Sequence, residues 1–115
     1  MKKVLTLTVN KEWFSLILSG EKTEEYREIK PYWASRLVNQ KAESGEVLFD
    51  EFGGYCRVLG ETEYKPFTHV LFYAGYAKDR QVVEKKIESI SIGKPQKGMC
   101  PEEWLNKDVF IIKFK

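Results

Sequence analysis

Hydrophobic residues recur at every second position through several segments of this chain, which is the period of a strand with one buried face. Over Val4–Val9 they alternate with threonines, whereas the run at 68–74 is apolar on both faces, as in a central strand. From 81 to 92 the apolar positions change parity between Ile87 and Ile90, which indicates a bulge or a sharp twist. The strands predicted in this way cover residues 4–9, 22–29, 68–74, 81–92 and 108–115.

Two segments in the N-terminal half have helical spacing instead. Residues 11–19 present one broad apolar face, with Asn10 as a cap before the helix and Gly20 as a left-handed end after it. Pro31 suits the first turn of a second helix, which we expect over 32–39. Two early helices and five or six mostly antiparallel strands predict an α+β domain, and the bulged long strand favours a small curled sheet or an open β-barrel.

The pattern weakens between residues 40 and 67, where glycines interrupt short apolar runs. This stretch is too long for an ordinary turn, so we expect an irregular insertion or lid that contains one short helix or strand. A chain of 115 residues otherwise fits a single domain, 1–115. Because long loops in compact domains often carry function, the insertion is also a candidate contact for a protein partner.

Composition narrows the class of protein. With 43% hydrophobic and 31% charged residues the chain has a globular profile, and a net charge of +2 is too weak to predict nucleic-acid binding by itself. Cys56 and Cys100 lie far apart and have no Cys/His pattern beside them, so we predict no metal site and no other cofactor. The N-terminus lacks a signal-peptide core and no run has membrane-spanning length, so we expect a cytoplasmic protein without membrane attachment.

The densest group of ionisable residues follows the first helix and comprises Lys22, Glu25 and Arg27. Lys22 is a candidate phosphate ligand, or a base if burial lowers its pKa; the alternative is a solvated lysine after a helix end. Glu25 is a candidate general base or an acceptor for a base amino group; the alternative is a structural salt bridge. Arg27 can clamp a phosphate with two hydrogen bonds, or brace Glu25.

A regular strand through this segment would separate these side chains. Strand residues alternate between faces, so Lys22 would lie opposite Glu25 and Arg27. The three converge only if Lys22 belongs to the preceding turn, or if the strand is bulged. Tyr26 and Trp33 offer stacking surfaces for a base, although aromatic residues in apolar stretches are more often core residues.

Five further residues are weaker candidates for the site. Tyr32 and Tyr76 could either stack on a base or belong to the core, as for the other aromatic residues. Lys30 and Arg36 could contact phosphate, but a solvated helix surface is the simpler interpretation. His69 is the single histidine and falls in a strand-like run with no nucleophile pattern nearby, which favours a core or edge position.

The segment Gly20-Glu21-Lys22-Thr23 with Glu25-Tyr26-Arg27, preceded by a strand and a helix, resembles the activating signal cointegrator homology (ASCH) family, which carries a G-x-K-x-x-E-x-R signature after its first helix. The resemblance extends to the strands at 70–74, 82–93 and 109–114 and omits 40–67. It implies a PUA-like fold, a small β-barrel with a cleft beside the first helix. It also implies RNA or nucleotide binding in that cleft, lined by Lys22, Glu25 and Arg27.

Some members of that family are hydrolases. One group removes the acyl group from acetylcytidine with a threonine nucleophile three residues after the lysine, where this chain has Glu25; Thr23 comes one residue after the lysine. Other members are ribonucleases. Their activity needs no hydroxyl nucleophile, so it is compatible with the lysine, glutamate and arginine of this segment.

Three hypotheses about function follow. The first is a module that binds RNA or a nucleotide through Lys22, Glu25, Arg27, Tyr26 and Trp33. The second is a small hydrolase of RNA or a modified nucleoside, in which Glu25 activates water and Lys22 stabilises negative charge. The third is a protein-interaction module that uses 40–67.

Overall fold

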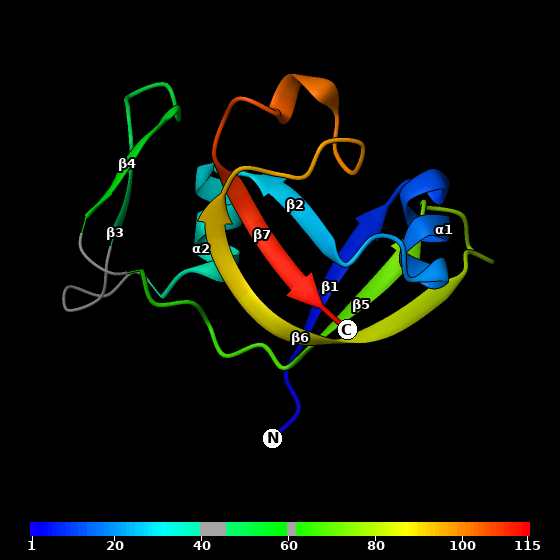
Figure 1. Ribbon diagram of the computed structural model, residues 1–115. Coiled ribbons are helices and arrows are strands. Elements are labelled where there is room, and N and C mark those ends of the chain that lie inside the picture. Colours follow the sequence, from blue (N-terminus) through cyan, green and yellow to red (C-terminus); the bar gives the residue numbers. More distant parts are fainter. Residues whose placement is uncertain (40–45, 60–61) are drawn as a thin grey trace.

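A computed structural model describes residues 1–39, 46–59 and 62–115 and has a mixed α+β architecture (Figure 1). The elements, in chain order, are β1 (Val4–Val9), α1 (Lys11–Ser19), β2 (Glu24–Glu28), α2 (Pro31–Leu37), β3 (Glu46–Phe49), β4 (Tyr55–Leu59), β5 (His69–Ala74), β6 (Val82–Gly93), a 3₁₀ turn (Glu102–Trp104) and β7 (Val109–Phe114). The predicted helices and main strands are all present, and their ends differ from the prediction by two residues or fewer.

Five strands form the main sheet in the order β1-β5-β6-β7-β2. β1 and β5 pair in parallel and every other pair is antiparallel, so the predicted, mostly antiparallel character is confirmed. The register of β6 against β7 shifts between Ile87 and Ser89, at the predicted change of parity. β6 bends strongly, and the sheet curls around its own inner face (Figure 1).

The sheet is curled but not closed. β1 and β2 are its two outer strands, and in the described part of the chain no backbone ladder joins them. The α+β class and the five-stranded sheet are therefore confirmed, whereas the closed barrel of a PUA-like fold is not.

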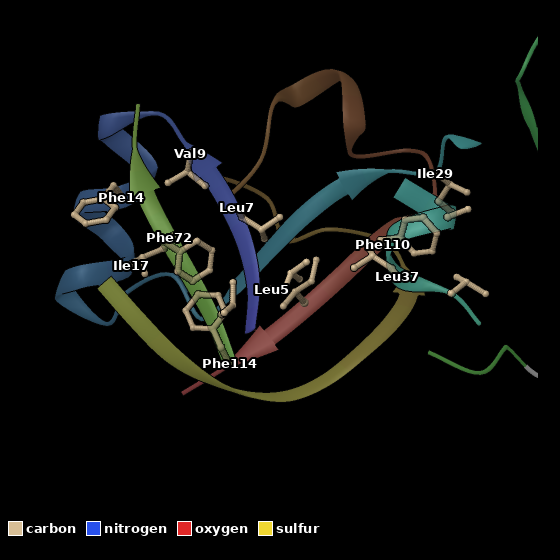
Figure 2. Close-up of a cluster of buried hydrophobic side chains, with 14 of the residues drawn as sticks. Leu5, Leu7, Val9, Phe14, Ile17, Ile29, Leu37, Phe72, Phe110 and Phe114 are labelled. Carbon is tan, nitrogen blue, oxygen red and sulfur yellow. The ribbon is translucent and has the colours of Figure 1, made fainter. Parts of the chain in front are cut away.

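The main core fills the inside of the curved sheet (Figure 2). Within it, Phe72 of β5 packs against Phe114 of β7, with ring centroids 5.0 Å apart. Side chains from both helices complete it, among them Ile17 of α1 and Leu37 of α2, both fully buried. Since each large apolar side chain contributes about 1.5–3 kcal/mol on burial, this shared core fixes the helices against the sheet.

Local sequence sets the ends of α1. The side-chain oxygen of Asn10 accepts a hydrogen bond of 2.8 Å from the Trp13 N–H, and Gly20 adopts the left-handed conformation with φ of 87°. α2 begins at Pro31 as its fixed φ favours, but it ends before the predicted position. It ends early because Val38 is extended and forms an isolated antiparallel bridge with Tyr64.

The region predicted as an insertion contains two strands rather than one short element. β3 and β4 form an antiparallel pair that stands apart from the main sheet in Figure 1. Asp50 closes the turn between them, because its carboxylate accepts hydrogen bonds from the N–H groups of Phe52 and Gly54, at 2.9 and 2.7 Å. The parts of the prediction that fall on residues 40–45 and 60–61 lie outside the described residues.

Across the described ranges, no helix is both long enough and apolar enough to cross a membrane.

Candidate functional site

Lys22 lies in the turn between α1 and β2, because β2 begins only at Glu24. Its backbone N–H donates to the carbonyl oxygen of Leu16, at 3.0 Å, which keeps this residue attached to the end of the helix. The alternation of a strand therefore does not apply to Lys22. Its ammonium nitrogen lies 3.4 Å from Oε1 of Glu25. The two residues therefore converge because Lys22 belongs to the turn, and not because the strand is bulged.

The ammonium group of Lys22 is enclosed. Its side chain has no exposed surface, and Nζ donates a hydrogen bond to the carbonyl oxygen of Met99. Nζ also lies over the rings of Trp13 and Tyr26, at 5.0 and 4.6 Å from their centroids. Burial lowers the pKa of Lys22 from its usual value, and the carboxylate of Glu25 opposes that shift.

Glu25 is the buried carboxylate of the group, with 6% of its side chain exposed. Oε1 accepts a hydrogen bond of 3.0 Å from the Tyr26 N–H and faces Lys22, while Oε2 lies 3.1 Å from Nη1 of Arg27. A carboxylate has about four lone-pair positions, so these three partners leave room for one more donor. Glu25 can therefore accept a hydrogen bond from a bound ligand without losing its own support.

Arg27 joins the two outer strands of the sheet. Nη1 donates to the Tyr26 carbonyl oxygen at 2.7 Å, and Nη2 donates to the Thr8 carbonyl oxygen of β1 at 2.9 Å. Its guanidinium also stacks on Trp33, 5.2 Å from the ring centroid. With a neighbouring carboxylate and two carbonyls as partners, most of its donors are occupied, and Arg27 acts as a brace across the open side of the sheet.

A cavity of about 590 Å³ opens beside this group, between α1, α2 and the loop that precedes β7. Its volume is within the range of roughly 300–1,000 Å³ that small-ligand pockets occupy. Six aromatic side chains line it: Trp13, Tyr26, Tyr32, Trp33, Tyr76 and Trp104. Its polar lining includes the carboxylate of Glu25, the guanidinium groups of Arg27 and Arg36, and two threonines of β1. Lys22 lies behind this wall and does not line the cavity.

The loop at 94–108 forms the far wall of the cavity. Tyr26 holds it, since its hydroxyl accepts a hydrogen bond of 3.1 Å from the Gln96 N–H and donates one of 2.7 Å to Glu24. Burial raises the pKa of Tyr26 well above its usual value, which keeps this hydroxyl a donor. The strand pattern assigns no element to the residues between 92 and 108 and therefore predicts no role for this loop. Its length and the aromatic Trp104 within it were the available signal.

Cys100 also lies in the cavity wall, a position that no pattern in the sequence predicts. Its side chain is buried, and its thiol lies 3.5 Å from the Gln96 carbonyl oxygen. Burial raises the pKa of Cys100 above its usual value, so the thiol stays protonated at neutral pH. A protonated thiol is a poor nucleophile. Cys100 therefore contributes to the shape of the cavity wall and is not a candidate nucleophile.

Arg36 is exposed on α2, in agreement with the solvated helix surface expected from the sequence, and it also lines the cavity. Its guanidinium carbon lies 5.6 Å from the ring centroid of Tyr32 and 5.9 Å from that of Trp33. Among the residues that the structure describes, no carboxylate pairs with it. Arg36 is therefore a cation at the cavity that remains available to an anionic ligand.

Three further residues lie outside this cavity. Lys30 pairs with Glu28 at 3.2 Å, and Thr23 is exposed in the turn before β2. His69 is half-buried, and its Nδ1 lies 2.8 Å from the hydroxyl of Thr68. His69 therefore has a local partner, in agreement with the structural interpretation of this residue.

Within the described part of the chain, no three His, Cys, Asp or Glu side chains lie together as ligands of a metal ion would. No family profile, no curated protein and no solved structure matches this chain.

Proposed function

We propose that this protein binds a nucleotide, free or within RNA, in the cavity beside α1 and α2. The observation that carries the proposal is the Glu25 carboxylate, which is buried at the wall of a cavity lined by aromatic rings and two arginines. A nucleotide combines a flat ring with N–H donors and a phosphate, and these three features match rings, a carboxylate and a guanidinium.

The base would lie among the aromatic side chains. Trp33 and Trp104 present ring surfaces to the cavity from α2 and from the loop before β7. Stacking of a base on an aromatic side chain contributes about 1–3 kcal/mol. Glu25 would accept a hydrogen bond from an amino or imino N–H on the edge of the base, through the lone-pair position that its protein partners leave open.

The phosphate would contact Arg36. Arg27 already donates to two carbonyl oxygens and faces Glu25, and Lys22 is enclosed behind the wall. Both residues therefore support the position of Glu25, while Arg36 supplies an available charge with a planar set of donors. This division of roles differs from the expectation that Lys22 itself contacts phosphate.

The resemblance to the ASCH family supports this proposal. The signature residues Lys22, Glu25 and Arg27 gather in three dimensions as one ion-paired group, and the cavity lies beside the first helix, as the resemblance implies. A PUA-like fold would also be compatible with a strongly curled sheet whose two outer strands are joined by a side chain. We therefore propose membership of that family.

A hydrolase remains the alternative, but no feature of the site favours turnover over binding. Thr23 is exposed outside the cavity, and the thiol of Cys100 is protonated. Glu25 is then the single candidate base among these residues. Hydrolysis is accordingly one outcome of the experiment that tests binding.

The experiment is calorimetric titration of the wild type, Glu25→Gln and Glu21→Gln with the four ribonucleoside 5′-monophosphates. Glu21 is exposed in the same turn, so its variant matches the charge change without altering the site. A hydrogen bond to a charged group contributes about 1.5–3 kcal/mol, so Glu25→Gln should weaken binding by about 10- to 100-fold, with Glu21→Gln unchanged within about twofold.

Equal affinity of the wild type and Glu25→Gln for every nucleotide would overturn the proposal, provided that circular dichroism shows both to be folded. For the hydrolase alternative, both proteins are also incubated with a short oligoribonucleotide and with acetylcytidine, which carry the bonds such enzymes cleave, and chromatography of the recovered ligand identifies turnover. An altered product that Glu25→Gln no longer generates would make the protein a hydrolase.

A further inference from the structure

Two of the tyrosines that line the cavity are largely exposed to solvent. Tyr32 is 60% exposed and Tyr76 is 85% exposed, yet both contribute to the lining of the cavity. They come from different elements, the first turn of α2 and the turn that follows β5 (Figure 1). Large exposed aromatic side chains that border a pocket are unusual on a solvated surface and are typical of binding sites.

Local structure places both residues at the cavity. Tyr32 contacts Trp33 edge to face, with centroids 5.0 Å apart and an interplanar angle of 88°, so its ring is partly ordered before a ligand binds. Tyr76 follows Gly75, whose φ of 72° makes a sharp turn directly after β5. The exposed surface of each ring is accessible to a flat group from solvent.

We infer that the cavity takes one nucleotide of an unpaired nucleic-acid strand, and that Tyr32 and Tyr76 stack the nucleotides on either side of it. This inference rests on the proposed function and specifies its ligand as a strand rather than a free nucleotide. Arg36, whose guanidinium lies over the ring of Tyr32, is placed to contact the phosphate that links the bound nucleotide to its neighbour.

The strand must be unpaired. A base inside a duplex has both faces stacked and its hydrogen-bonding edge occupied, so it can neither enter a cavity lined by rings nor present an N–H to Glu25. The chain's net charge of +2 also agrees with a short single-stranded site rather than an extended contact with duplex phosphates.

The experiment compares affinity for one nucleotide with affinity for a short strand. Fluorescence anisotropy and calorimetry give the dissociation constants of the four ribonucleoside 5′-monophosphates and of the matching homopentanucleotides, as RNA and as DNA. The measured quantity is the ratio of the two constants for each base. We expect the pentanucleotide to bind at least about tenfold more tightly than the mononucleotide, because each additional stacked base adds roughly that much.

The variants Tyr32→Ala and Tyr76→Ala should each reduce this ratio by about tenfold. Phe52→Ala is the matched control, since Phe52 is 89% exposed in the β3–β4 turn and does not line the cavity. It should leave the ratio unchanged. All three positions are exposed, so circular dichroism should show unchanged melting.

Three results would overturn the inference: a ratio near one, a ratio that both tyrosine variants retain, or equal binding of a pentanucleotide and of a hairpin whose stem keeps the same sequence paired. Each of these leaves mononucleotide binding and its dependence on Glu25 intact, so the inference can fail while the proposed function stands. Tighter binding of the RNA pentanucleotide than of the DNA form identifies RNA as the ligand, and the reverse identifies DNA.

Discussion

The ammonium nitrogen of Lys22 lies 3.4 Å from Oε1 of Glu25, and both side chains are almost fully buried. The contact forms because Lys22 leaves the end of α1 in a turn, while Glu25 already belongs to β2. Arg27 approaches the other oxygen of the same carboxylate. A negative charge at the cavity wall is thereby held between two positive charges.

Replacing Lys22 with methionine should destabilise the protein by about 3 kcal/mol. Removal of one partner from a buried ion pair leaves the other charge partly uncompensated, although Arg27 and the Tyr26 N–H still support Glu25. Urea unfolding of the wild type and of Lys22→Met measures the difference.

The double variant Lys22→Met/Glu25→Gln tests whether this loss comes from the pair. It should lose less stability than the sum of the two single variants, since neither charge then remains alone. Additivity to within about 0.5 kcal/mol would show that the two groups are independent in the folded protein.

Replacing Arg27 with lysine should cost about 1–2 kcal/mol of unfolding free energy. A lysine ammonium cannot donate in the planar, forked geometry that reaches the carbonyl oxygens of Tyr26 and Thr8 together, and it loses the stacking on Trp33. Arg36→Lys is the control, because Arg36 bonds to no strand in the described part of the chain, and its unfolding free energy should change by less than about 0.5 kcal/mol. Equal losses for the two variants would contradict a bracing role for Arg27.

Stability should fall as the pH rises above 10. Burial raises the pKa of Tyr64 to about 12 and that of Tyr26 further, so between pH 10 and these values the folded protein holds protons that the unfolded chain has lost. The contribution of these two tyrosines to the free energy of unfolding is fully present below pH 10. It is lost as the pH rises through the pKa that each has in the folded protein. The lowered pKa of Lys22 acts in the opposite direction up to pH 10.5, where the unfolded chain holds the extra proton.

Urea unfolding between pH 9 and 11.5 measures this dependence. Tyr26→Phe should reduce the slope above pH 10.5 by up to about 1.4 kcal/mol per pH unit, because one linked proton is removed. An unchanged slope would show that Tyr26 ionises equally in both states.

Replacing Thr23 with alanine should leave nucleotide affinity within about twofold and stability within about 0.5 kcal/mol of the wild type. Thr23 is exposed, and its link to β7 is made by its backbone carbonyl, which accepts from the Phe114 N–H and survives the substitution. Incubation of both proteins with acetylcytidine tests the alternative. Deacylation by the wild type that Thr23→Ala abolishes would identify a threonine nucleophile.

Structure that depends on neighbouring residues could be predicted from the sequence. Asn10 and Gly20 mark the ends of α1 because a cap and a left-handed residue act within one turn of the helix. The bulge in β6 was visible because a change of parity is a property of one strand. The ion-paired group of Lys22, Glu25 and Arg27 could be proposed, but its convergence could not be decided.

What the sequence did not predict depends on contacts between distant segments. The loop at 94–108 became a wall of the cavity only because Lys22 binds the Met99 carbonyl and Tyr26 binds Gln96. The hydrophobic periodicity of a segment does not predict hydrogen bonds to residues far away in the chain. Arg36 is exposed on α2, as its helix position predicts, but its place at the cavity depends on segments that are distant in the chain and could not be predicted.

The order of strands has a consequence for the way this protein is made. β7 leaves the ribosome after the six other strands described above, yet it lies between β6 and β2, and it pairs Ile112 with Glu25. Until β7 emerges, β2 has no backbone partner in the main sheet, and ladders between segments so distant in the chain form slowly. The wall that carries Glu25 is therefore completed only after β7 emerges, and a nascent chain cannot hold the proposed ligand before then.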